Sequence, residues 1–100
     1  MNKRTSFLLI LMFLIVTIPS HAQWIQTNGP YGGQVQCFLV SGANLFVGTS
    51  NAGVFVSTND GTSWAPLNNG LTNLSVRALV ISGTNLFAGT GGGVFLSKNA

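Results

Sequence analysis

Apolar residues along this chain come in short runs that turn-forming residues separate. Residues 7–18 form one continuous apolar stretch, broken only by Thr17, and after it Gly, Asn, Ser and Thr divide the apolar positions into short segments. Such segments are rich in branched and aromatic residues and bounded by turn residues, which is typical of strands. No helical periodicity appears beyond residue 22. The pattern therefore predicts an all-β fold.

The strand pattern repeats with a period near 40 residues. Ser41–Thr49 and Ser82–Thr90 are identical at seven of nine positions, at an offset of 41. The flanking segments also match, Val35–Val40 with Val76–Ile81 and, at an offset of 40, Gly53–Ser57 with Gly93–Ser97. A period of this length indicates one supersecondary unit used more than once.

Each period contains four candidate strands. In the first period they are Val35–Val40, Asn44–Thr49, Gly53–Thr58 and Ser63–Leu67. Pro66 restricts the last of them to an outer edge, because proline has no N–H to donate to a neighbouring strand. Four antiparallel strands in about 40 residues predict one blade of a β-propeller. We expect about two blades of an incomplete ring.

The repeat divides the chain into four parts. These are a signal peptide (1–22), an N-terminal outer strand and loop (23–33), a complete blade (34–74) and a partial second blade (75–100). Trp24–Gln26 matches the fourth strand of a blade whose other strands lie elsewhere. Because propellers need about 4–8 blades, we expect a fragment of a longer protein, or a chain that assembles with copies of itself to close the ring.

Residues 1–22 have the features of a secretory signal peptide. Lys3 and Arg4 form a basic start, residues 7–18 form the apolar region, and Ser20-His21-Ala22 forms a small-residue cleavage site. The apolar stretch is shorter than the roughly 20 residues of a membrane span. An uncleaved anchor is the alternative. We expect a secreted, periplasmic or cell-surface protein with no stable membrane span after cleavage.

Few charged side chains remain beyond residue 22. Arg77, Lys98 and Asp60 give residues 23–100 a net charge of about +1. Binding of nucleic acid needs clustered basic residues, so it is not expected. A single acid cannot supply the two carboxylates of a glycosidase, and Cys37 with Asp60 is too small a ligand set for a metal. We expect no catalysis, metal or cofactor within residues 23–100.

The turn after the third strand of the first period contains a motif. The segment Ser57–Trp64 resembles the Asp-box of BNR-like propellers, whose pattern is Ser-x-Asp-x-Gly-x-Thr-Trp. The corresponding residues are Ser57, Gly61 and Trp64, with Ser63 in place of Thr, and Asn59 in place of Asp with Asp60 one position late. The second period begins the same motif with Ser97 and Asn99.

This resemblance implies a fold and leaves the function open. Families with such blades include sialidases, xyloglucan-active glycosidases, sortilin-type receptors and photosystem II assembly factors. In these families the box is a structural turn on the blade periphery, away from the ligand face. We accordingly expect Asn59 to accept hydrogen bonds from backbone N–H groups two or three residues on, Gly61 to adopt a positive φ, and Trp64 to bury its ring.

Four other features have both a functional and a structural interpretation. Cys37 could be a nucleophile, but Ala78 occupies the same place in the repeat, so a buried structural residue is expected. Asp60 is expected to be an exposed turn residue rather than a general acid. Arg77, which matches Gln36, is expected to be solvated rather than bound to a ligand carboxylate. The run Gly91–Gly93 predicts a tight hairpin, because no helix or Lys-Ser/Thr follows it.

Trp24 and Trp64, 40 residues apart, could stack on sugar rings, but their place in the repeat favours a packing role. The function favoured by the sequence is therefore a binding or scaffold module, with an unknown protein or glycan as partner. The alternative is the N-terminal portion of a propeller glycoside hydrolase whose catalytic residues lie outside this chain. A sensor or assembly factor would need a charged surface, which this sequence does not provide.

Overall fold

The computed structural model describes residues 22–98. The predicted signal peptide, apart from Ala22, and the motif residue Asn99 lie outside the described part. Within it the chain forms seven strands and no helix. The strands are β1 (Val35–Ser41), β2 (Asn44–Thr49), β3 (Val54–Ser57), β4 (Ala65–Pro66), β5 (Val76–Ser82), β6 (Asn85–Thr90) and β7 (Gly93–Ser97). The prediction of an all-β fold is confirmed.

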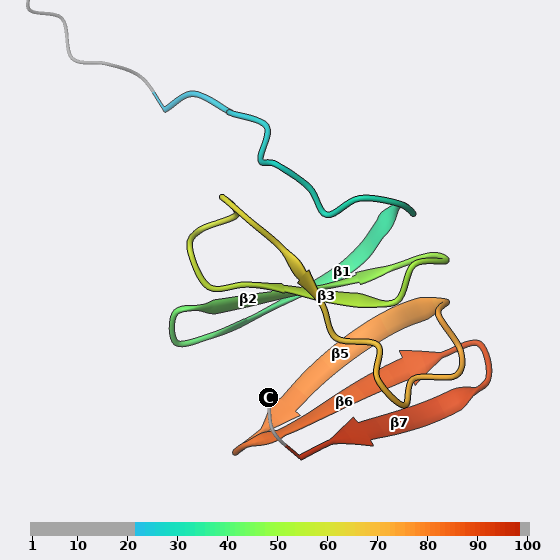
Figure 1. Ribbon diagram of the computed structural model, residues 1–100. Helices are drawn as coiled ribbons and strands as arrows, with labels where there is room; N and C mark the ends of the chain where they lie inside the picture. Colours follow the sequence, from blue (N-terminus) through green and yellow to red (C-terminus); the bar gives the residue numbers. More distant parts are fainter. Residues whose placement is uncertain (1–21, 99–100) are drawn as a thin grey trace, which may run out of the picture.

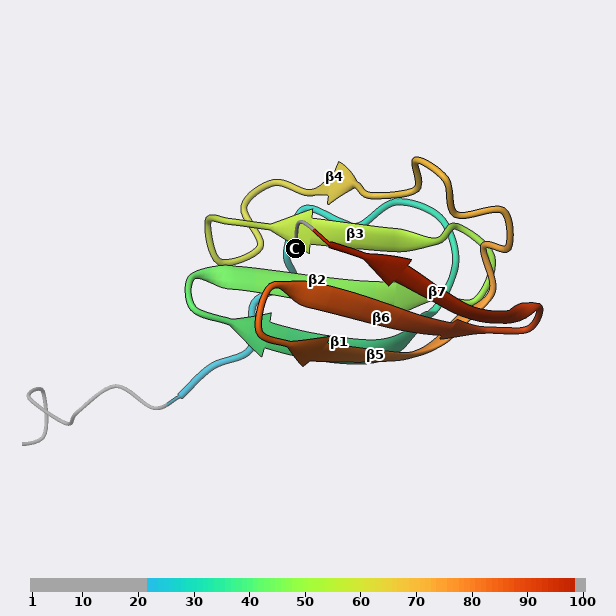
Figure 2. The same cartoon turned by 90° about the horizontal axis from the view of Figure 1, so that it is seen from below.

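The strands form two antiparallel sheets with simple up-and-down order. The first sheet has the order β1-β2-β3-β4 and the second has the order β5-β6-β7 (Figures 1 and 2). The four strands predicted for the first period are all present. The last is shorter than Ser63–Leu67, because β4 holds only Ala65 and Pro66. It lies at the sheet edge, where the missing N–H of Pro66 costs no ladder hydrogen bond.

The sequence repeat is also a repeat in three dimensions. Val35 lies opposite Thr49 in the first sheet, and Val76 lies opposite Thr90 in the second. Each sheet then has the same irregularity in register two residues later. One sequence pattern therefore builds the same strands, pairings and bulge twice.

The two sheets stack face to face (Figure 2). The hydrophobic core lies between them and draws on both. Its buried members are Phe46, Val54, Val76, Leu79, Leu86 and Ala88. Each sheet therefore shields the apolar face that the other exposes. No closed ring of sheets forms within residues 22–98.

Gly48 of β2 lies against Val76 of β5. A Cβ atom on Gly48 would lie 2.5 Å from Cγ1 of Val76 and 2.6 Å from Sγ of Cys37. Real Cβ atoms do not approach so closely, so only glycine permits this contact. Val76 is completely buried there.

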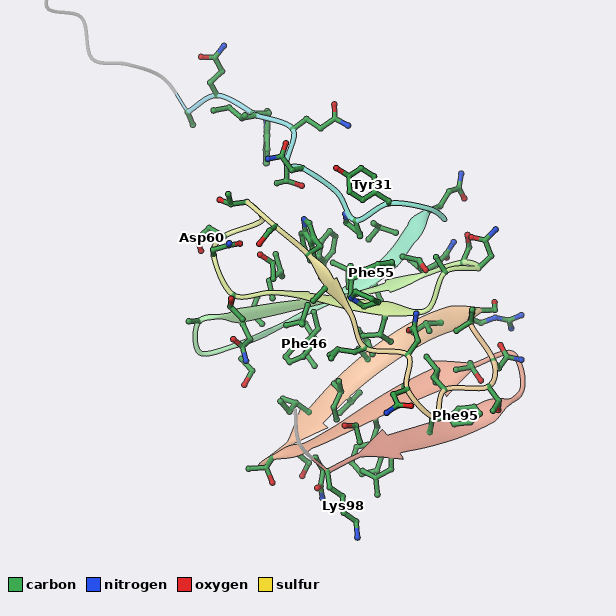
Figure 3. The ribbon with its side chains drawn as sticks, viewed as in Figure 1. Tyr31, Phe46, Phe55, Asp60, Phe95 and Lys98 are labelled. Carbon is green, nitrogen blue, oxygen red and sulfur yellow. The ribbon has the colours of Figure 1, made fainter. Side chains whose placement is uncertain are left out.

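Residues 23–34 contain no strand. We call residues 27–34 the N-terminal strap, because they run from the turn between β3 and β4 to the turn between β2 and β3. The amide N of Asn28 donates to the carbonyl of Gly61 over 3.4 Å, and that of Ser50 donates to the carbonyl of Gln34 over 2.9 Å. In Figure 3, Tyr31 of the strap and Phe46 lie on opposite sides of the first sheet, with Phe46 toward the second.

The segment before the strap differs from the sequence expectation. Trp24–Gln26 forms no strand, and the side chain of Trp24 is 100% exposed. The prediction of a packing role for Trp24 is not met within this chain. The reason is that an outer strand needs a neighbouring strand, and residues 24–26 pair with none of the strands in the described part of the chain. Their pairing with strands outside the chain stays a prediction.

Candidate functional site

The predicted motif forms the turn between β3 and β4. Asp60 and Gly61 adopt φ values of 58° and 86°, so two successive residues are left-handed. Aspartate is one of the few residues other than glycine that tolerates this region. Gly61 behaves as the sequence predicts. The pair reverses the chain direction within the turn.

Ser57 is the centre of the hydrogen bonds in this turn. Its side chain is 1% exposed. The hydroxyl Oγ accepts from the amide N of Gly61 over 2.8 Å and from that of Asn59 over 3.4 Å. It donates to Oδ1 of Asn59 over 3.0 Å. A buried hydroxyl is therefore fully used by the turn itself.

Asn59 binds farther along the chain than predicted. Its Oδ1 accepts from the amide N of Ser63, four residues on, over 3.0 Å. Its Nδ2 donates to Oγ of Ser63 over 2.8 Å. The nearer amide, that of Gly61, is taken by Ser57. Asn59 thus acts as acceptor and donor at once, which a side-chain amide can do.

The strap covers one side of this turn. A Cβ on Gly29 would lie 3.0 Å from Cδ1 of Trp64, and a Cβ on Gly61 would lie 2.7 Å from Cγ2 of Thr27. Trp64 is partly buried, and its Nε1 is buried without a hydrogen-bond partner among residues 22–98. Ser57, Gly61 and Trp64 are thus held by contacts within the fold, whereas Asn59, Asp60 and Ser63 remain exposed.

Cys37 lies on β1 against the core between the sheets. Its burial raises the pKa of the thiol above the ordinary value of 9.0, while a hydrogen bond with the backbone of Gly48 acts in the opposite direction. A thiol with a raised pKa is a poor nucleophile at neutral pH. This agrees with the structural interpretation of Cys37.

The charged candidates do not form a site. Asp60 is exposed in its turn and Arg77 is exposed on β5, as the sequence predicts. No group of three or more His, Cys, Asp or Glu side chains that could hold a metal occurs in the described residues. Residues 22–98 also contain no helix of the length and apolarity that crossing a membrane requires.

The glycine run forms the hairpin between β6 and β7, with Gly91 and Gly92 at its tip. Thr90 closes it: Oγ1 donates to the carbonyl of Gly93 over 2.7 Å and accepts from the amide N of Gly92 over 3.1 Å. In the first repeat, Thr49 makes the same two kinds of hydrogen bond. The run is therefore a structural turn, as predicted.

One groove was not predicted from the sequence. It has a volume of about 400 Å³ and lies between the segment after β4 and the face of β6 and β7. Its lining includes Pro66, Leu67, Asn69, Gly70, Leu86 and Phe95. A signal for it was present, because the second repeat has no fourth strand within the described residues.

Comparisons of the chain with protein-family models, with curated proteins and with solved structures find no match. Conclusions about function therefore depend on the geometry described above. The structure brings together Ser57, Asn59, Gly61, Ser63 and Trp64. It leaves Asp60 at the margin of that network, and Ser97 at the end of β7, separate from it.

Proposed function

We propose that this chain is an exported segment of β-propeller repeats that serves as a binding or scaffold module and performs no catalysis itself. Each repeat is an antiparallel meander of short strands, as a propeller blade is. The two meanders share one register and stack face to face. The turn from Ser57 to Trp64, with its serine, asparagine and glycine network, supports the Asp-box interpretation.

The observation that carries this proposal is the separation of the reactive side chains. Cys37 is partly buried against the core, Asp60 lies in a turn and Arg77 lies on the second sheet. None of the three hydrogen-bonds with another in the described residues. An activated nucleophile needs a base within hydrogen-bond reach. The repeated sheets offer contact surfaces in their place.

Export and lack of catalysis can be tested together in a bacterial host. We expect the full chain to leave the cytoplasm and its exported form to begin at Gln23, as shown by intact mass. The exported protein should not hydrolyse chromogenic glycosides. Retention of the uncleaved chain would contradict export. Hydrolysis that the Asp60→Ala variant abolishes would show that the chain is an enzyme.

A further inference from the structure

The first sheet contacts the second through one defined face. Directly opposed residues in an antiparallel pair point to the same side of a sheet. By this rule and the register, the contact face consists of Cys37, Leu39, Phe46, Gly48, Val54 and Val56. All but Gly48 belong to the core or pack against it.

The second sheet repeats this face on its outer side. The repeat equivalents of the contact face are Ala78, Val80, Phe87, Gly89, Val94 and Leu96. Val80, Val94 and Leu96 are 57%, 73% and 49% exposed. The second sheet therefore exposes an apolar face to solvent, whereas the equivalent face of the first sheet is covered by the second sheet. A face of this kind commonly marks an interaction surface.

The first sheet also presents the opposite half of the contact. The second sheet packs on the contact face through Val76, Leu79, Leu86 and Ala88. Their repeat equivalents on the first sheet are Val35, Phe38, Leu45 and Val47. Val35 is 42% exposed and Phe38 is 65% exposed, whereas Leu45 is partly buried and Val47 is completely buried. One molecule therefore displays one half of the contact on the second sheet and the β1 part of the other half on the first sheet.

The strap does not prevent a second copy from docking on the outer face of the first sheet. The strap ends in a hydrogen bond from the amide of Ser50 to the carbonyl of Gln34. The segment between β4 and β5 ends in the equivalent bond, from the amide of Gly91 to the carbonyl of Ser75. The segment between β4 and β5 is present while the two sheets pack on each other. The strap holds the equivalent place on the first sheet, so it should leave room for the same kind of contact with a second copy.

Gly89 has the space that such a neighbour needs. Gly48, its equivalent, accommodates Val76 of the second sheet. A Cβ on Gly89 meets only Ala78, at 3.6 Å from its Cβ and 3.9 Å from its carbonyl oxygen. The residue equivalent to Val76 is the exposed Val35. In a second copy, Val35 can therefore occupy the space over Gly89.

The same arrangement would complete the second sheet. The outer edge of β7 has no partner strand in the described residues. In the first sheet β4 pairs with β3, with Ala65 opposite Val56. The equivalents are Ile25, which is 86% exposed, and Leu96 of β7. A second copy would thus add Ile25–Gln26 as the fourth strand beside β7.

Trp24 of a second copy would fit into the groove that Gly70 lines. Its equivalent, Trp64, lies against Gly29 of the strap. Asn28-Gly29 corresponds to Asn69-Gly70, and both glycines have positive φ. No atom lies within 4 Å of a Cβ built on Gly70, which lines the groove of about 400 Å³. The exposed indole of Trp24 in a second copy would fill the place that Trp64 fills beside Gly29.

We infer that copies of this chain associate head to tail. The first sheet of one copy packs on the outer face of the second sheet of another, and its residues 24–26 complete that sheet and its groove. The contact is heterologous, because different surfaces of the two copies meet. The inference goes beyond the proposed function, and it rests on the internal contact between the two repeats.

Cysteine cross-linking tests this arrangement in the full chain. The variant carries Val35→Cys and Gly89→Cys, with Cys37→Ala to remove the native thiol. In the internal contact, the Cβ of Val76 lies 3.1 Å from a Cβ built on Gly48, close enough for cross-linking once the chains adjust. The two new cysteines lie on opposite ends of one molecule, so a disulfide between them must join two copies.

We expect mild oxidation to give a ladder of linked copies at least about tenfold faster than for a control with Thr84→Cys in place of Gly89→Cys. Mass spectrometry of mixed light and heavy chains should find residue 35 of one copy bonded to residue 89 of another. Adding Trp24→Ala should slow the ladder several-fold. A rate equal to the control, a rate unaffected by Trp24→Ala, or bonds only to other proteins would overturn the inference.

The length of the ladder separates this inference from the propeller proposal. If the repeats form a ring of about 4–8 blades, the ladder ends at about two to four copies. A ladder without an upper limit still supports head-to-tail contact, and it contradicts a closed ring. No ladder contradicts the contact and leaves the propeller proposal to its own test.

Discussion

Val76 fills a space that exists only because residue 48 is glycine. A Cβ at position 48 would lie 2.5 Å from Cγ1 of Val76, which is completely buried between the sheets. Gly89, in the same place of the second repeat, has no such neighbour. Two glycines at the same position of the two repeats therefore differ in their surroundings, which shows which face of each sheet is occupied and supplies a matched pair for experiment.

Gly48→Ala should destabilise the fold, and Gly89→Ala should not. The added methyl group at position 48 collides with Val76 and Cys37, and overpacking of this kind costs about 1–3 kcal/mol. At position 89 the nearest atom is 3.6 Å away, so the change should stay within about 0.5 kcal/mol. Urea denaturation of dilute protein measures both. Equal losses for the two variants would contradict the stacking of the sheets.

Trp64→Ala should cost much more stability than Trp24→Ala. Trp64 is partly buried against the strap, and truncating a large aromatic residue of this kind costs about 3 kcal/mol. Trp24 is 100% exposed, so its loss should be close to neutral in protein too dilute to associate. Thermal unfolding followed by circular dichroism compares the two. A loss below about 1 kcal/mol at Trp64 would mean that its ring is free to bind a ligand.

The sequence predicted most of the strands and little of their environment. Strand positions depend on local alternation and on Gly and Asn turns, which the repeat shows twice. The exposure of Trp24 could not be predicted in this way, because it depends on whether a neighbouring sheet exists. The groove beside Gly70 was missed for the same reason. The partners of Asn59 depend on Ser57 taking the nearer amide, which a motif alone does not specify.

Asn59→Ala should weaken the turn, whereas Asn59→Asp should preserve it. Alanine removes the acceptor for the amide of Ser63 and for the hydroxyl of Ser57, at a cost of about 1–2 kcal/mol. A carboxylate keeps both of these interactions and strengthens them by its charge. It loses the donation from Nδ2 to Oγ of Ser63, but the Ser63 hydroxyl can instead donate to the second carboxylate oxygen. Urea midpoints at neutral pH give the comparison.

The Asn59→Asp variant should also acquire a pH dependence. Hydrogen bonds from the amide of Ser63 stabilise the charged carboxylate and lower its folded pKa below the unfolded value of about 4. Its contribution is present above that value and is lost as the pH falls through the folded pKa. The wild-type chain serves as the control between pH 7 and pH 2. A variant that lost no more stability than wild type would show that the carboxylate does not join the network.

Cys37 should react slowly while the protein is folded. Burial raises the pKa of its thiol above 9.0, so the thiolate is scarcer than in the unfolded chain at the same pH. Because burial disfavours the thiolate, the shift leaves stability unchanged below the unfolded pKa and lowers it as the pH rises from the unfolded pKa to the folded pKa. Rates of modification with a thiol reagent, with and without urea, test this. Equal rates would show that the thiol is exposed.

The most direct test of the account is a nuclear Overhauser measurement between the methyl groups of Val76 and the α protons of Gly48 in the folded protein. The two residues are 28 positions apart in the sequence and belong to different repeats. Stacked repeats predict a strong cross-peak between them and no comparable methyl contact to Gly89 in dilute protein. Absence of the Val76–Gly48 cross-peak, with strand pairing intact in both sheets, would contradict the stacking.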